Sequence, residues 1–233
     1  MATSTLSAGP RRRSGPSTVV WKTVMAITGL IFVGFILAHM YGNLMIFGGQ
    51  AAFDEYAHHL RELGAPMLPE SGFLWLMRIT LIVALVLHAY AAFTLWARAG
   101  RARHQRYAVT KQGYGQFYAK AMRWGGVALL LFVVFHILHF TTNTIQINGD
   151  FAAPSDRLVS SFEVWWAVLI YLLAVLALGL HLRHGIHGAA MTLGLNTSLT
   201  AQRRIHQVAI AVAVVTVVGF MVPPFAILLG LTP

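Results

Sequence analysis

The sequence contains no cysteine, and only 10% of its 233 residues are charged, whereas about 25% is typical of a soluble domain. The lack of cysteine excludes disulfide bonds and cysteine-ligated zinc or iron–sulfur sites within this chain. A bound metal would therefore need His, Met, carboxylate or backbone ligands. The hydrophobic content of 57% and the mean hydropathy of +0.66 indicate an integral membrane protein.

Patterns of a self-sufficient enzyme are also missing. We find no Ser/His/Asp set, no glycine-rich phosphate loop and no carboxylate pair in a plausible pocket. Acidic residues are few, 7 against 17 Lys and Arg, and the formal net charge is +10. Because the basic residues lie between apolar runs, this charge is expected to set the topology and to meet anionic lipid. We expect no nucleic-acid partner.

Five apolar runs reach the roughly 20 residues that a membrane-spanning helix needs. Each run is longer than a core strand, and proline is nearly absent until positions 223 and 224. The expected fold class is therefore all-α, an integral bundle of five transmembrane helices. The predicted helices are about Val19–Leu44, Phe73–Ala97, Met122–Thr142, Phe162–Arg183 and Gln207–Leu231.

Residues 1–18 are rich in Ser, Gly, Pro and Arg, and we expect them to form a disordered basic arm before a membrane domain at 19–233. The first apolar run is too long for a signal peptide, so we expect it to be retained. Five aromatic residues near the predicted helix ends suit an interfacial aromatic belt. They are Trp75, Trp124, Trp165, Trp166 and Tyr171.

The basic residues are strongly biased to one side of the predicted bundle. Fourteen of the 17 fall on the side of the N-terminus, whereas Arg61, Arg78, Arg157 and all seven acids fall on the other. The positive-inside rule then places the N-terminus in the cytoplasm and the C-terminus outside, as in a multi-pass protein of the cell inner (cytoplasmic) membrane. We expect a short interfacial helix within 53–70. The basic loop 98–120 is a candidate dock for a soluble partner, or a positive-inside loop and no more.

Four predicted helices carry a histidine at membrane depth, where ionisable groups are costly and usually functional. At about 1.5 Å per residue, His39 and His136 fall roughly 25 and 20 Å from the basic side, in the outer half. His88 and His184 lean toward the basic side. One intramembrane histidine could simply bond to a backbone carbonyl, but four that pair by depth favour two bis-histidine haems in a four-helix core.

Spacing leaves part of the ligand set open. His139 and His181 lie three residues from His136 and His184, and depth alone accepts either member of each pair. Several small or cationic residues could let a porphyrin approach or could bind its propionates, although helix packing and contact with lipid headgroups are the common roles of such residues. They are Gly34, Gly42, Gly179, Gly185, Gly188, Arg78, Arg183 and His187.

Four motifs carry a resemblance to a known family. They are Ala-His-Met-Tyr-Gly-Asn-Leu at 38–44, Leu-His-Ala-Tyr at 87–90, Phe-His-Ile-Leu-His-Phe at 135–140 and His-Leu-Arg-His-Gly-Ile-His-Gly at 181–188. In this order they resemble the first four helices of the dihaem cytochrome b anchor subunits of succinate dehydrogenases and fumarate reductases. The resemblance runs from position 21 to the fifth helix, and the fifth helix and the N-terminal arm add nothing specific.

The resemblance implies two haem b groups with axial ligands at four histidines. It pairs His39 with His136 and His88 with His184 as ligands of the two haem irons. It also implies a flavoprotein subunit and an iron–sulfur subunit as partners, and a membrane quinone, menaquinone or ubiquinone, as substrate. The chain would then be the non-catalytic electron-transfer anchor of the enzyme. One departure from the pattern is His187-Gly188, where relatives often carry a polar or bulky residue.

Three other functions compete with this interpretation. The chain could be the dihaem anchor of another membrane oxidoreductase, a haem-free anchor, or a proton-conducting protein or transporter. The last is disfavoured because transporters usually show inverted repeats or helices broken near mid-membrane. We further expect the haem nearer the basic side to be the easier to reduce. Candidate proton donors to a quinone are Asp54, Tyr56, His58, His59 and Glu70.

Overall fold

The computed structural model describes residues 15–102 and 114–232, with backbone only for 114–119. Most of the predicted arm and the middle of the predicted basic loop lie outside these ranges. The described elements are all helices, which confirms the all-α class. Five are long and apolar enough to cross a membrane. They are α1 (Thr18–Leu44), α3 (Gly72–Arg101), α4 (Tyr114–His136), α6 (Trp165–Thr192) and α7 (Leu199–Leu228).

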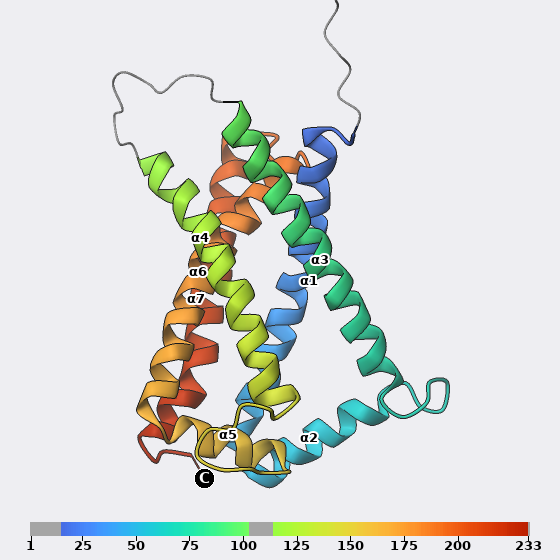
Figure 1. Ribbon diagram of the computed structural model, residues 1–233, viewed down its shortest axis with the longest axis vertical. Helices are drawn as coiled ribbons and strands as arrows, with labels where there is room; N and C mark the ends of the chain where they lie inside the picture. Colours follow the sequence, from blue (N-terminus) through green and yellow to red (C-terminus); the bar gives the residue numbers. More distant parts are fainter. Residues whose placement is uncertain (1–14, 103–113, 233) are drawn as a thin grey trace, which may run out of the picture.

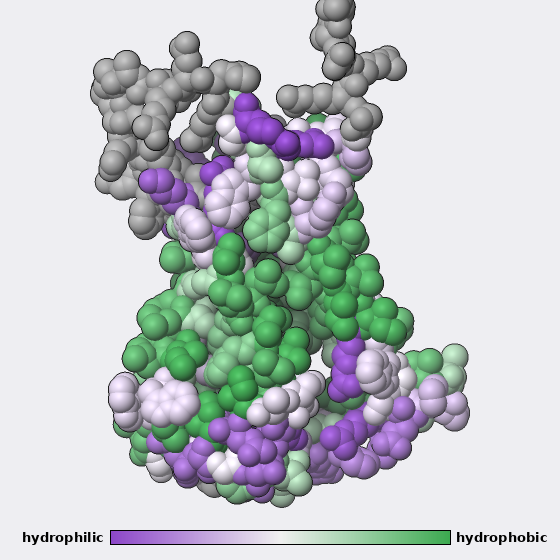
Figure 2. Space-filling model, viewed as in Figure 1, coloured by the Kyte–Doolittle hydropathy of each residue, from purple (hydrophilic) through white to green (hydrophobic). Residues whose placement is uncertain are grey.

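Shorter helices cover one end of the bundle (Figure 1). After α1 come a turn of 3₁₀ helix, η1 (Met45–Gly48), and α2 (Gln50–Glu62), which is the expected interfacial helix. A π-helical turn, η2 (Ile137–Thr141), continues α4, and α5 (Pro154–Phe162) precedes α6. The spanning helices place an apolar band between this end and the opposite one (Figure 2).

Several spanning helices extend beyond the bounds predicted from hydropathy: α4 begins at Tyr114 rather than near Met122, and α3 continues to Arg101. α6 continues to Thr192, so the whole histidine-rich stretch at its end is helical. α7 begins at Leu199 rather than near the predicted Gln207, because the Ser198 side chain accepts a hydrogen bond from the Ala201 amide and caps the helix. The first two turns of α7 are polar and therefore escaped a prediction based on hydropathy.

The best-packed part of the bundle lies between α6 and α7, near α5. Its buried residues are Ile46, Leu158, Phe162, Val168, Tyr171, Val175, Met221 and Ile227. α1 packs against α3, α6 and α7, and α4 packs against α6. In the most apolar 18-residue stretch of each helix, 11% of the residues are buried in α1 and in α3, and none in α4. The corresponding shares are 33% in α6 and 39% in α7. Protein side chains therefore cover α1, α3 and α4 sparsely.

The two ends of the bundle differ in charge. The described cations at the end where α1 begins are Lys22, Arg98, Arg101, Lys120, Arg123, Arg183, Arg203 and Arg204. We call this the basic end. Arg98 donates hydrogen bonds to the Pro16 carbonyl at 2.9 Å and to the Thr18 hydroxyl at 3.4 Å, which joins the end of α3 to the start of α1. The described acids lie at the α2–α5 end, and the cytoplasmic placement of the basic end stays a prediction.

Gly179 of α6 packs tightly against Val217 of α7. A Cβ at this position would lie 2.5 Å from Cγ2 of Val217. Gly179→Ala should therefore lower the melting temperature of the protein in detergent, because overpacking costs about 1–3 kcal/mol. Val217→Ala in the same chain should restore most of the loss. A Gly179→Ala protein that melts like the wild type would contradict this account of the α6–α7 contact.

Candidate functional site

The rings of His39 and His136 lie side by side in the bundle, as the depth argument predicts. Their centroids are 5.8 Å apart, with His39 on α1 and His136 at the last position of α4. Phe35 stacks on His39 at 5.3 Å, and Phe220 of α7 lies 5.8 Å from the same ring. The pair is therefore enclosed by aromatic side chains from α1 and α7.

A hydroxyl on α1 orients His88 of α3. Nδ1 of His88 lies 3.0 Å from Oγ1 of Thr28, and that hydroxyl donates to the Val24 carbonyl at 2.7 Å. The Thr28 oxygen therefore accepts a hydrogen bond from the ring. Nδ1 then carries the proton, and Nε2 keeps its lone pair. This tautomer is the one that a metal ligand needs.

The ring of His88 lies close to that of His181 on α6. The two centroids are 6.3 Å apart. His181 lies against α4 at Gly126, where a Cβ would come within 3.5 Å of the ring. Nδ1 of His181 is buried and has no hydrogen-bond partner in the described part of the chain. An unpartnered buried nitrogen is costly in a protein interior, and it is compatible with a site completed by a bound group.

The predicted ligand His184 lies one helical turn further along α6. Its immediate charged neighbours are Arg183 and His187, and His187 faces His206 of α7 with 6.2 Å between centroids. Ligation by either histidine stays a prediction, but the ring separation favours His181 over His184 as the partner of His88.

His139 is engaged at both ring nitrogens. It is 2% exposed, with Nδ1 2.9 Å from the Tyr171 hydroxyl and Nε2 2.9 Å from the Ser161 hydroxyl. Because neither nitrogen is available to a metal, the structure favours His136 over His139. The prediction that Tyr171 belongs to an aromatic belt is wrong, since this side chain is only 7% exposed. The four tryptophans of that prediction are 41% to 66% exposed and fit it.

Both ring pairs have the separation of two axial ligands on one metal. Two metal–nitrogen bonds of about 2 Å, with about 1 Å from each nitrogen to its ring centre, put the centroids about 6 Å apart. The observed 5.8 and 6.3 Å match this value. Binding to one metal does not fix the angle between the two ring planes, because each ring can rotate about its metal–nitrogen bond. The donor set would therefore suit two haems, each held by one of these histidine pairs.

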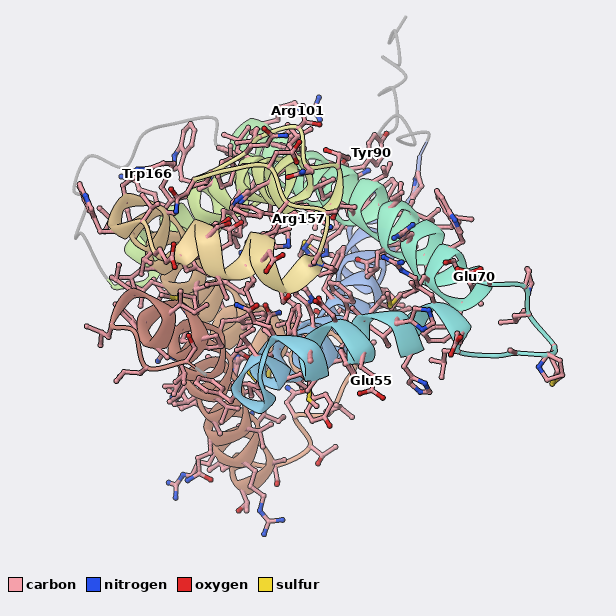
Figure 3. The ribbon with its side chains drawn as sticks, turned by 90° about the horizontal axis from the view of Figure 1, so that it is seen from below. Glu55, Glu70, Tyr90, Arg101, Arg157 and Trp166 are labelled. Carbon is pink, nitrogen blue, oxygen red and sulfur yellow. The ribbon has the colours of Figure 1, made fainter. Side chains whose placement is uncertain are left out.

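The proposed quinone residues at the α2–α5 end do not converge on one pocket. The Asp54 carboxylate accepts hydrogen bonds from the Ser155 amide and hydroxyl at 2.9 and 2.7 Å, so it anchors α5 to α2. His58 pairs with Glu62 at 3.7 Å on the exposed side of α2. Glu70 lies on the rim near the start of α3, apart from α5, which carries Arg157 (Figure 3).

Tyr56 is the one member of that set beside α1. Its ring would meet a Cβ on Gly42 at 3.0 Å, and the Tyr41 ring lies 6.2 Å away. Burial, with a smaller contribution from Tyr41, raises the pKa of the Tyr56 phenol above its usual value, which favours the neutral form. Gly42 therefore serves helix packing in this structure.

Sequence reasoning missed three functional candidates, Thr28, Tyr171 and Ser161. All three bring a hydroxyl to a histidine of the bundle. The available signal was their polarity within or beside an apolar run, where an unbonded hydroxyl is unfavourable. Their histidine partners lie 60, 32 and 22 residues away in sequence, which no local pattern reveals.

In comparisons with known proteins, no family model, no curated protein and no solved structure matches the chain.

Proposed function

We propose that this chain is the membrane anchor of a succinate–quinone oxidoreductase and carries two b-type haems. His39 and His136 ligate one haem iron, and His88 and His181 ligate the other. The observation that carries the proposal is the pair of ring contacts near 6 Å, each made by partly buried histidines of two different helices. The contact between His187 and His206 has a similar separation, but His206 is exposed at the basic end. His181 takes the place of His184 in the ligand set predicted from the sequence.

The two sites lie at different depths, which suits electron transfer across the bilayer. Thr28 orients His88 and therefore marks the depth of its site. On α1, Thr28 and His39 are 11 residues apart, or about 16 Å along the helix axis. A haem supplies reversible one-electron redox chemistry when bound. The protein holds the ligand tautomers, excludes water with aromatic and aliphatic side chains, and thereby sets the environment on which the potentials depend.

The expected partners are a flavoprotein and an iron–sulfur protein at the basic end, and a quinone in the membrane. Two observations support this assignment. The motifs at 38–44, 87–90, 135–140 and 181–188 resemble those of such anchors. The basic end also gathers cations from α1, α3, α4, α6 and α7, which suits an acidic soluble partner and supports the proposal that this end faces the cytoplasm.

The test is to purify the chain from its native membrane and to measure its pigment and its partners. We expect a reduced b-type absorbance, two haems per chain, and co-purification of a flavoprotein that oxidises succinate. A pigment-free preparation would favour a haem-free or proton-conducting protein and would overturn the proposal. If the preparation holds two haems but co-purifies with a different partner, such as a hydrogenase, the chain is still a cytochrome b. The assignment to succinate oxidation would then be wrong.

The Thr28 hydroxyl should tune the haem at His88. Thr28→Val keeps the shape of the side chain and removes the acceptor for Nδ1–H, so the ligand donates less electron density to iron and the midpoint potential of this haem should rise. Thr28→Ser should keep the wild-type potential. Redox titration of the two absorbance components checks this, and equal potentials for the Val and Ser variants would contradict it.

A further inference from the structure

A chain of hydrogen bonds leads from His136 into the protein interior. Nδ1 of His136 lies 3.2 Å from the Tyr171 hydroxyl, which lies 2.9 Å from Nδ1 of His139. Nε2 of His139 lies 2.9 Å from the Ser161 hydroxyl, and this hydroxyl donates to the Arg157 carbonyl at 2.6 Å. The three middle side chains are between 2% and 7% exposed. The chain joins α4, η2, α5 and α6.

The bond from Ser161 to the Arg157 carbonyl fixes the donor and the acceptor in every other hydrogen bond of this series. A carbonyl only accepts, so the Ser161 hydrogen points at Arg157 and the Ser161 oxygen accepts Nε2–H of His139. A neutral imidazole has one N–H, so Nδ1 of His139 accepts from Tyr171. The Tyr171 oxygen is then an acceptor for Nδ1–H of His136, and Nε2 of His136 keeps its lone pair.

We propose that Tyr171 is a positioning residue of the His39–His136 haem site, which holds His136 in the metal-binding tautomer and keeps His139 out of the ligand set. The inference rests on the proposed function, since it assigns Tyr171 a role toward that haem. The hydroxyl serves both histidines at once. It accepts a hydrogen bond from Nδ1–H of His136. It also donates a hydrogen bond to Nδ1 of His139, so that this nitrogen is not available to a metal.

The bond to Tyr171 also sets how strongly His136 donates to iron. An acceptor on the outer N–H of a ligating imidazole raises its basicity and fixes its ring orientation. A more basic ligand stabilises the ferric state, so removal of the acceptor raises the midpoint potential. The effect is confined to one haem, because the His88 ring is oriented by Thr28 instead.

The experiment is a redox titration of the purified, haem-loaded complex carrying Tyr171→Phe. We expect two haems per chain, an upward shift of one midpoint and an altered low-spin ferric signal for the same haem in electron paramagnetic resonance. The matched control is Tyr41→Phe, which removes the hydroxyl of a tyrosine that is 58% exposed on α1. The control should leave both midpoints and both signals unchanged.

Ser161→Ala is the second variant, because it leaves Tyr171 and both histidines in place. It removes the acceptor that fixes the His139 tautomer, so the same midpoint should shift in the same direction, and Ser161→Thr should restore the wild-type value. If Tyr171→Phe fails to load two haems, the Ser161 pair decides by the same criterion. Unchanged midpoints and signals in a two-haem variant overturn the role of Tyr171. A wild-type protein without haem overturns the proposed function instead.

Discussion

Replacing His181 with alanine is expected to lower the haem content from two to one per chain. The ring of His181 on α6 lies 6.3 Å from the ring of His88, which Thr28 orients. If His181 ligates the proposed haem, an alanine at this position would remove one of its two protein ligands. Pyridine haemochrome analysis of the purified variant gives the content, and redox titration identifies which haem is lost.

The matched control for this substitution is His184→Ala, one turn along the same helix. This variant should keep two haems, since His181 is the proposed ligand on α6. The reverse result, loss in His184→Ala and retention in His181→Ala, would restore the ligand set implied by the family resemblance. It would also show that α6 turns about its axis when haem binds.

Alanine at His39 and at His88 should remove different haems. Each variant should retain one haem, the double variant none, and each should lose most quinone reduction, because the electron path across the membrane is interrupted. The melting temperature should fall too, since a ligand present at 1,000 times its Kd stabilises the folded state by about 4 kcal/mol. Haem analysis, redox titration and thermal unfolding in detergent check the three effects.

An exposed histidine provides the control for these two losses. His58 is 66% exposed on α2 and belongs to neither ring pair. His58→Ala should keep two haems and the wild-type melting temperature. If His39→Ala and His88→Ala remove the same haem, the pairing of histidines by depth is wrong. That result would leave the proposal that the protein binds haem standing.

The sequence was sufficient for the five spans and for the His39–His136 contact. Lys22 and Arg123 mark where the apolar runs begin, and a constant rise per residue then places both histidines at similar depth. The same arithmetic does not separate His181 from His184. Residues three apart on a helix differ by only about 4.5 Å in depth and about 60° in direction. That choice depends on how α6 is rotated against α3, which is a tertiary property.

Local departures from ideal helix geometry were harder to predict. The π-helical turn after His136 changes the register of the chain, so an ideal helix projection does not place His139. α5 was overlooked, although Pro154 at its first position and Asp156 in its first turn are helix-start signals. Its position matters because α5 brings Ser161 to His139, and the carboxylate of Asp54 fixes it from α2.

The sparse covering of α3 and α4 bears on how a pigment would be loaded. Among the described residues, α3 packs on α1 and α2 while α4 packs on α6 (Figure 1). α3 and α4 meet at the basic end, where the Trp96 ring lies 5.6 Å from that of Trp124. A flat macrocycle dissolved in the bilayer could therefore slide in laterally after all spans have inserted, without any helix being pulled out. Biogenesis would then need no dedicated opening step.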